Sequence, residues 1–151
     1  AWFSVRALRS MLPWAIWVEA VATDSLAERD HVIATWPHIY RYEGVAYHTS
    51  SLTDLQPLYR FYNVVSKSHF YTASPGEADV VAAAMADVFA YDGETYRVST
   101  AAAADKLAVY RFYNVRTGSH FYTASATERD SVLAGLSGLY TYEGIGFWLG
   151  Q

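Results

Sequence analysis

Short stretches in which aromatic and polar residues alternate recur along the chain. Residues 59–72 are YRFYNVVSKSHFYT, and residues 110–123 are YRFYNVRTGSHFYT. Each stretch holds two runs rich in Tyr and Phe, such as 59–63 and 68–72, joined by a polar linker. Two such runs around a short polar linker predict a β-hairpin.

A helix is predicted after each hairpin. The signature is a serine followed three residues later by a glutamate, and it occurs at Ser25/Glu28, Ser74/Glu77 and Ser125/Glu128. The serine hydroxyl accepts a hydrogen bond from the first turn of the helix, and the glutamate is expected to reach back to the N–H of the cap. Apolar residues then follow at helical spacing, for example Val80, Val81 and Ala84. We therefore interpret the three glutamates as members of capping boxes.

Each copy ends in an aromatic run that a glycine interrupts. These runs are 40–47, 89–96 and 140–147, with Glu-Gly or Asp-Gly in the middle of each. Because glycine permits a positive φ, the run is expected either to bend or to turn back as a second tight hairpin.

Three copies of this unit predict the fold. The repeats are 23–48, which is partial, 58–98 and 109–149, within a single domain over 1–151. One unit of this size cannot bury its apolar face alone, whereas three packed around an axis can. We predict an α+β, mostly β, compact domain with pseudo-threefold symmetry, built from strand-strand-helix-strand repeats and resembling a β-trefoil. The alternative is an open stack of three units, which leaves unpaired edges at both ends.

The first copy differs from the others in its front half. Residues 10–14 and 19–23 stand where the two hairpin motifs belong, and they contain no His and no Tyr. The front half is thus either lost or diverged, and residues 1–22 are a native segment, a leader remnant or a frame-shifted stretch. Basic residues followed by the apolar run 11–18 have the layout of a signal peptide. The interpretation we prefer is a packed or amphipathic segment that covers the gap left by a missing hairpin.

Several motifs in this order resemble a known family. YRFYN and SHFYT in the second and third copies, S-x-x-E-R-D at 25–30 and 125–130, and Y-x-Y-E-G-x-x-F at 140–147 carry the resemblance. They are similar to a tandem repeat of unknown function that occurs in secreted bacterial and fungal proteins and is appended to extracellular hydrolases. The resemblance covers 23–149 and implies an extracellular accessory module suspected of binding carbohydrate or cell-wall polymer. It brings no established catalytic residues.

Pleat alternation selects the candidate ligand-binding residues of the hairpin. If Asn63 lies opposite Ser68, then Phe61 and Phe70 form a core pair on one face. The other face carries an outward quartet in each complete copy: Arg60, Tyr62, His69 and Tyr71, then Arg111, Tyr113, His120 and Tyr122. Tyr rings can stack on the apolar face of a sugar, and Arg and His can donate to its hydroxyls. The alternative is that the quartet is a second structural layer, with Arg stacked on Tyr.

Acidic and amide side chains complete the candidate set. The carboxylates that precede the turn glycines, Glu43, Asp92 and Glu143, are expected to accept hydrogen bonds from sugar hydroxyls. Asn63 and Asn114 are expected to stabilise the hairpin turns by hydrogen bonding to their own backbone.

Composition excludes several classes of function. The chain has 151 residues with 11 basic and 15 acidic side chains, a net charge of −4, so we expect no nucleic-acid partner and no membrane partner. It has no Cys, which excludes disulfides and thiolate chemistry. The five His residues show none of the usual metal-binding spacings. We predict no metal and no cofactor, and the sequence does not specify an oligomeric state.

Three functions are consistent with these features. The leading hypothesis is a secreted, lectin-like module that binds carbohydrate or a cell surface, with two full sites and a defective one in the first copy. The first alternative is a small extracellular hydrolase of glycans or esters that uses His69 or His120 and a carboxylate such as Glu143. The second is a protein–protein interaction domain, since Tyr, Trp and Arg also mark interaction hot spots.

Overall fold

The described residues of the computed structural model, 2–10, 20–23, 25–37, 40–50 and 55–150, form three helices and nine strands. In chain order these are β1 (Trp2–Ser10), β2 (Ala20–Thr23), α1 (Leu26–Thr35), β3 (Tyr40–Ser50), β4 (Gln56–Asn63), β5 (Ser68–Thr72), α2 (Pro75–Ala84), β6 (Phe89–Val98), β7 (Lys106–Asn114), β8 (His120–Thr123), α3 (Ala126–Gly135) and β9 (Tyr140–Gly150). The chain is therefore mostly β, with short helices between strands.

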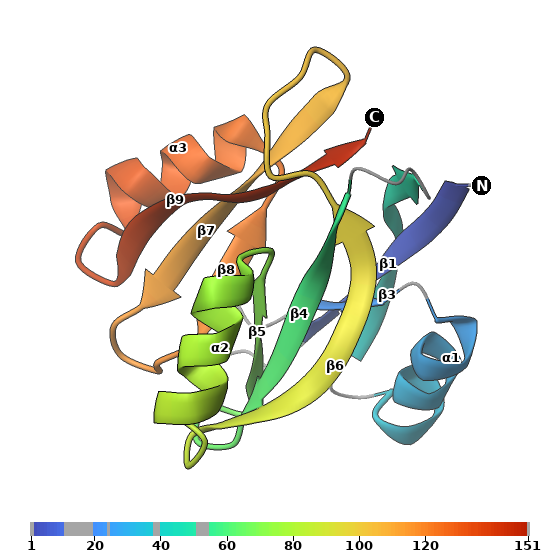
Figure 1. Cartoon of the computed structure of the whole chain (residues 1–151), viewed down its shortest axis with the longest axis horizontal. Coiled ribbons are helices and arrows are strands. Elements are labelled where there is room, and N and C mark those ends of the chain that lie inside the picture. Colours follow the sequence, from blue (N-terminus) through green and yellow to red (C-terminus); the bar gives the residue numbers. More distant parts are fainter. Residues whose placement is uncertain (1, 11–19, 24, 38–39, 51–54, 151) are drawn as a thin grey trace.

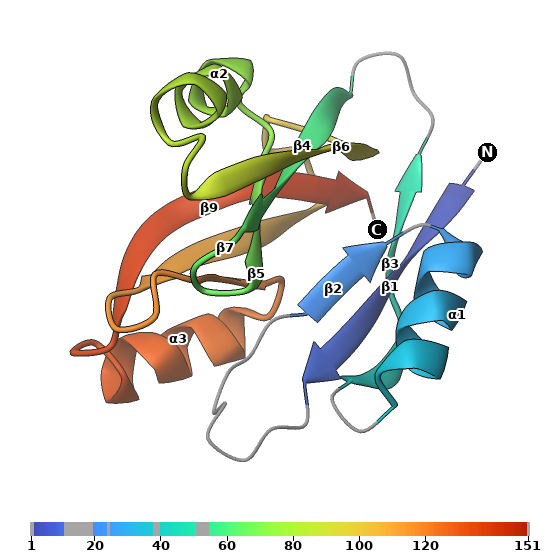
Figure 2. The same ribbon diagram turned by 90° about the horizontal axis from the view of Figure 1, so that it is seen from below.

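The strands form antiparallel sheets of three strands each, ordered β2-β1-β3, β5-β4-β6 and β8-β7-β9 within the described part of the chain. We call each sheet, together with its helix, a lobe, so that lobes 1, 2 and 3 contain α1, α2 and α3. The predicted strand-strand-helix-strand order is confirmed in each lobe. Figure 1 shows the lobes side by side, coloured from blue to red, and Figure 2 shows the helices at three outer corners.

The hairpin register agrees with the prediction from pleat alternation. In lobe 2, Phe61 lies opposite Phe70 and Asn63 opposite Ser68. Both phenylalanines are buried, with their ring centroids 6.2 Å apart. Lobe 3 repeats the register, and Phe112 is buried against Phe121. Each of these two lobes therefore has its own aromatic core between sheet and helix.

The sequence of the first copy does not predict a hairpin, but lobe 1 contains one. β1 pairs with β2, with Arg6 opposite Thr23 and Arg9 opposite Ala20, and β1 also pairs with β3. The front half of the first copy has thus diverged in sequence while keeping its strands, and the expectation of a gap left by a missing hairpin is wrong. Residues 11–18, on which the signal-peptide interpretation rests, lie outside the described residues.

The last strand of each lobe bends at its glycine and does not turn back as a second hairpin. Gly93 and Gly144 both have a φ of 96°. At this point two residues of the strand lie opposite one residue of the central strand, Arg60 in lobe 2 and Arg111 in lobe 3. Such a β-bulge redirects the side chain beside it. Here it places the carboxylate before each glycine next to the arginine of the central strand.

Lobes 2 and 3 share a further core between them. It contains Leu58, Tyr71, Ala73, Tyr96 and Val98 from lobe 2, and Val109, Phe147 and Leu149 from lobe 3. The long strands β3, β6 and β9 also contact one another pairwise. Burial of apolar surface between the lobes therefore joins them into one compact unit.

Each helix is capped by the predicted serine, but in α2 and α3 the glutamate does not close the capping box as expected. The side chains of Ser25, Ser74 and Ser125 each accept a hydrogen bond of 3.2 Å from the N–H of the glutamate three residues later. The N–H groups of Ser74 and Ser125 donate instead to the hydroxyls of Thr72 and Thr123, at 3.0 Å. The threonine before each of these caps thus replaces the glutamate side chain, which can bind elsewhere.

Candidate functional site

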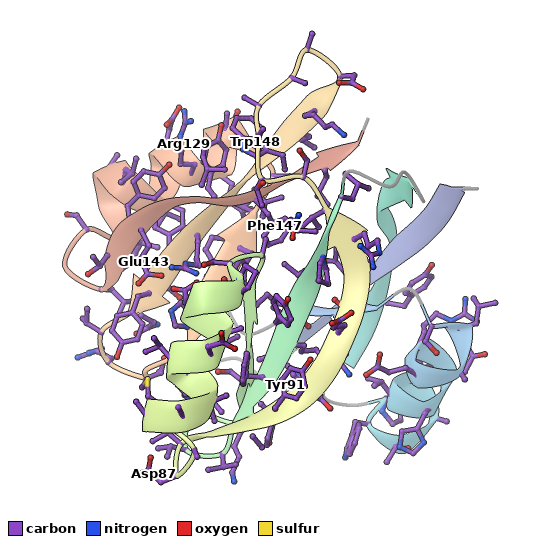
Figure 3. All side chains as sticks on the ribbon, in the orientation of Figure 1. Asp87, Tyr91, Arg129, Glu143, Phe147 and Trp148 are labelled. Atoms are coloured by element: carbon purple, nitrogen blue, oxygen red, sulfur yellow. The ribbon has the colours of Figure 1, made fainter. Side chains whose placement is uncertain are left out.

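Charged side chains gather where one lobe meets the next. We call these groups junction cluster A, between lobes 1 and 2, and junction cluster B, between lobes 2 and 3. Cluster A contains Glu28, Arg60, His69 and Asp92, and cluster B contains Glu77, Arg111, His120 and Glu143. In both, the first glutamate comes from the first turn of the preceding lobe's helix, and the other residues come from the sheet of the following lobe. Figure 3 labels Glu143 on β9.

Arginine lies at the centre of cluster B. The guanidinium of Arg111 donates two hydrogen bonds to the carboxylate of Glu77, with Nη1–Oε2 at 2.8 Å and Nη2–Oε1 at 3.0 Å. Its Nε lies 2.9 Å from Oε2 of Glu143. Nε2 of His120 lies 3.3 Å from the same oxygen. One guanidinium therefore forms ion pairs with two carboxylates from different lobes, and the imidazole contacts the second.

Cluster A has the same plan with a shorter acid. Nη1 of Arg60 lies 3.0 Å from Oε1 of Glu28, across the boundary between lobes 1 and 2. Its Nε lies 2.7 Å from Oδ2 of Asp92. Nε2 of His69 is 3.5 Å from that oxygen, slightly farther than in cluster B. Because both clusters combine a β-bulge in one lobe with the helix N-terminus of the preceding lobe, we infer that these two backbone features position the charged side chains.

The acids of cluster B are held in their ionised form. Burial opposes ionisation of Glu77, but hydrogen bonds from Arg111 and Thr72 outweigh this effect and lower its pKa. A hydrogen bond from His120 lowers the pKa of Glu143, again against burial, and the charge of Arg111 adds to the shift. These carboxylates are therefore hydrogen-bond acceptors at neutral pH.

The carboxylates form the exposed rim of each cluster, above the arginine. In lobe 2 the side chain of Asp92 is 40% exposed, while that of Arg60 is 12% exposed. Lobe 3 repeats the pattern, with Glu143 29% and Arg111 15% exposed. Solvent thus reaches the oxygens of Asp92 and Glu143, while the less exposed arginine beneath each carboxylate fixes its orientation.

A half-buried tyrosine ring lies beside each histidine, as the register predicts. The ring centroids of Tyr62 and His69 are 5.3 Å apart, and those of Tyr113 and His120 are also 5.3 Å apart. In cluster B, the ring of Phe70 from lobe 2 packs on His120, at 4.8 Å between centroids. Each cluster therefore combines fixed acceptors with an aromatic neighbour.

Two members of the predicted outward quartets, the buried Tyr71 and the partly buried Tyr122, pack between lobes 2 and 3, so the expectation that they face outward is wrong. The hydroxyl of Tyr122 accepts a hydrogen bond from the backbone N–H of Tyr71 and donates one to its carbonyl, both at 2.9 Å. The two rings meet edge to face at 5.7 Å. Burial raises the pKa of Tyr122, and Tyr71 belongs to the shared core. These two residues fit the alternative interpretation, a structural layer.

The junction between lobes 3 and 1 differs from the other two. The register of β1 and β2 places Ala7 where lobe 2 has Arg60, and Ala20 where it has His69. The side chain of Glu43, a predicted acceptor, lies outside the described residues. Lobe 1 therefore has alanine at the two positions where lobe 2 has the basic residues of its cluster.

Sequence reasoning did not find the role of Glu28 and Glu77 as partners of the next lobe's arginine. Their position in the capping motif gave a sufficient local explanation. A half-buried arginine requires a carboxylate partner. The copies that carry this arginine are the second and third, and each follows a copy that has a glutamate in its capping motif. This pattern is the signal that could have revealed the pairs.

The described residues contain neither a metal-binding group nor a membrane-spanning helix. Among them, no group of at least three His, Cys, Asp or Glu side chains is placed to hold a metal ion. None of the helices in the described part of the chain has the length and apolar character needed to cross a membrane.

A family model matches most of the chain. Residues 18–149 match the model described as Domain of unknown function (DUF5648). The matched range includes every residue of both junction clusters. No curated protein and no solved structure matches the chain.

Proposed function

This chain belongs to the family described as Domain of unknown function (DUF5648), and within that family we propose that it is a secreted, non-catalytic module that binds carbohydrate or a cell-wall polymer through its two junction clusters. The observation that carries the proposal is the duplication of one arrangement, in which an arginine and a histidine orient an exposed carboxylate. The resemblance to repeats of secreted proteins supports the extracellular location.

A fixed carboxylate suits the hydroxyl groups of a sugar. Asp92 and Glu143 each form an ion pair with an arginine, and their exposed sides can accept hydrogen bonds from sugar hydroxyls. Because both side chains are already oriented, binding costs little conformational entropy. Tyr62 and Tyr113 offer ring surface for the C–H groups of the sugar. The proposal leaves out Tyr71 and Tyr122, since they pack in or against the core between lobes 2 and 3.

Two sites on one chain favour a polymeric ligand. Linked sites that bind repeating units of the same polymer gain avidity, because the second binding event is intramolecular. The proposal includes a pseudo-threefold, β-trefoil-like arrangement of the lobes, which the pairwise contacts of β3, β6 and β9 support. In that arrangement the two clusters occupy equivalent positions, and the third position is defective.

Hydrolysis is the second candidate, and the contact of His120 with Glu143 favours it. A glycosidase requires a carboxylic acid with a raised pKa as proton donor. The pKa of Glu143 is instead lowered, by a hydrogen bond from His120 and by the charge of Arg111, despite burial. Binding is therefore the better interpretation of this cluster.

Retention on immobilised polysaccharides, chosen from a glycan-array screen, tests the proposal. Asp92→Asn or Glu143→Gln alone should weaken retention about tenfold, and the double variant should lose it, because each removes a charge-assisted hydrogen bond. Asp87→Asn is the matched control, since Asp87 is an exposed acid in the turn between α2 and β6, where Figure 3 labels it.

Two results would overturn the proposal. One is unchanged retention by a folded double variant, checked by its thermal unfolding. The other is turnover of a chromogenic glycan or ester by the wild-type chain that disappears in His120→Ala, which would assign the cluster to hydrolysis instead.

A further inference from the structure

Lobes 1 and 3 each cover a tyrosine ring with an arginine from the first turns of their helix. The guanidinium carbon of Arg129 lies 4.5 Å from the centroid of Tyr110, and that of Arg29 lies 5.6 Å from the centroid of Tyr42. Each arginine also binds the aspartate that follows it, with Nε of Arg129 at 2.8 Å from Oδ1 of Asp130. A cation over an aromatic face is attracted by the ring's π electrons.

Lobe 2 keeps the rings and the aspartate but has no arginine at this position. The motif is E-R-D at 28–30 and 128–130, but E-A-D at 77–79, so Ala78 replaces the arginine. Tyr91 packs on Phe61 at 5.1 Å, as Tyr142 packs on Phe112 at 5.0 Å. Tyr91 is the counterpart of Tyr42, which Arg29 covers, and Tyr59 is the counterpart of Tyr110, which Arg129 covers. Lobe 2 therefore has both kinds of ring but alanine at the position of the arginine.

The missing arginine leaves the ring of lobe 2 more open. Tyr91 is 55% exposed, compared with 38% for Tyr142 and 37% for Tyr42. Figure 3 labels Tyr91 on β6 of lobe 2 and Arg129 on α3 of lobe 3. Asp79, which corresponds to the aspartate that binds arginine in the other lobes, is exposed.

The charge at this position is also reversed. Glu94 lies opposite Tyr59 on the central strand, where lobe 3 has Ile145 opposite Tyr110. Glu94 is exposed and close enough to Tyr91 to contribute, after desolvation, to the raised pKa of its hydroxyl. Compared with lobe 3, lobe 2 has therefore lost a positive charge and gained a negative one beside two tyrosines.

We propose that Tyr59, Tyr91, Asp79 and Glu94 form a binding site for a guanidinium group, supplied by an arginine side chain of a partner protein. The incoming group would occupy the position that Arg129 occupies in lobe 3, stacked on tyrosine and bound by carboxylate. The planar guanidinium suits this site because it stacks on rings and donates in a fork. The site is separate from the junction clusters and does not depend on carbohydrate binding.

An NMR titration with Nα-acetyl-arginine N-methylamide tests the site on the whole chain. We expect saturable shifts at the amides of Asp79 and Tyr91, and none with the citrulline analogue, a neutral isostere of arginine. Ala78→Arg places the cation of lobe 3 into lobe 2 and should abolish these shifts. Ala83→Arg is the matched control, because it adds the same charge on an exposed position of α2.

A second variant tests the site without requiring that an arginine side chain fits at position 78. Glu94→Ile, which introduces the residue of lobe 3, should weaken binding about threefold, as loss of one exposed charge predicts. Equal shifts with the citrulline analogue, or undiminished binding by a folded Ala78→Arg variant, would overturn the assignment. Shifts at Tyr91 with neutral saccharides, and none with the arginine compound, would show that the two tyrosines stack on sugars instead. Arginine binding should survive Asp92→Asn combined with Glu143→Gln, which separates this site from the proposed function.

Discussion

The turn between the first two strands of lobes 2 and 3 depends on a single asparagine. Oδ1 of Asn114 accepts hydrogen bonds from the N–H groups of Arg116 and Thr117, at 3.0 and 3.2 Å. Asn63 makes the same pair of bonds in lobe 2. Both asparagines are buried, so the amide replaces solvent for two backbone donors.

Replacement of this amide should therefore be costly. Asn114→Ala leaves two backbone N–H groups without their acceptor, and we expect a loss of about 1–3 kcal/mol in the free energy of unfolding. Urea denaturation measures it. Arg116→Ala, in the same turn, removes only an exposed side chain and should change stability by less than about 0.5 kcal/mol. Equal effects of the two variants would show that the amide does not support the turn.

Gly144, at the bulge of lobe 3, has a backbone requirement that Gly138 in the same lobe lacks. Gly144 has a φ of 96°, and a Cβ added there would meet no atom within 4 Å, so only the backbone conformation opposes a side chain. Gly138 has equal space and no positive φ. Replacing each of the two glycines by alanine therefore measures backbone strain at Gly144 without a contribution from steric crowding at either position.

Opposite signs are expected for the two glycines. Gly144→Ala should destabilise the chain by about 1–3 kcal/mol, the cost of holding a residue with a Cβ in this region. Gly138→Ala should be neutral or stabilise by up to about 1 kcal/mol, because it restricts the unfolded chain. Thermal unfolding of both variants checks this. A neutral Gly144→Ala would mean that the bulge tolerates another conformation.

At the scale of strands and helices, local chemistry is sufficient to predict the elements of lobes 2 and 3, but not the first two strands of lobe 1. Alternation around Phe61 and Phe70 predicts the hairpin register, and the serines predict the helix starts. Gly93 predicts an irregularity in its strand but leaves open whether the strand bends or turns back. Each of these features depends on residues close in sequence, whose geometry the backbone dictates. What lies across a lobe boundary could not be predicted in this way. The exposure of Tyr71 and the partner of Glu77 depend on where the next lobe packs.

Helix α2 is tied to lobe 3 by the ion pairs of cluster B, which makes stability depend on pH. The pKa values of Glu77 and Glu143 lie below their ordinary value of 4.5, with burial opposing and Arg111 and His120 producing the shift. A carboxylate with a lowered folded-state pKa stabilises the fold fully above its unfolded-state pKa. This contribution is lost as the pH falls through the folded-state value.

We therefore expect the free energy of unfolding to fall as the pH drops below about 4.5. Arg111→Met should be less stable at pH 7 and should show a shallower decline on acidification, because the pKa values of Glu77 and Glu143 are lowered less without its guanidinium. Arg116→Met, which removes an exposed arginine from a nearby turn, is the control. Urea denaturation between pH 3 and 7 gives both slopes. Parallel curves for the wild type and Arg111→Met would contradict the role of the ion pairs.

At the scale of the whole molecule, one hydroxyl joins the sheets of lobes 2 and 3. β5 lies at the edge of its sheet, with β4 on one side. The hydroxyl of Tyr122 binds both the N–H and the carbonyl of Tyr71 on β5, at 2.9 Å. An exposed strand edge invites pairing with other chains, and this tyrosine occupies part of that edge from the neighbouring lobe.

Tyr122→Phe removes only this hydroxyl and keeps the ring in the shared core. Because two backbone groups of Tyr71 lose a buried partner, we expect a loss of about 1–3 kcal/mol in the free energy of unfolding. Hydrogen exchange at the amide of Tyr71 should accelerate more than exchange at Phe61 in the centre of the sheet, since the edge opens first. Tyr142→Phe, on an exposed ring of the same lobe, should change neither quantity. If both variants unfold alike and exchange at Tyr71 is unchanged, packing alone holds the two lobes together.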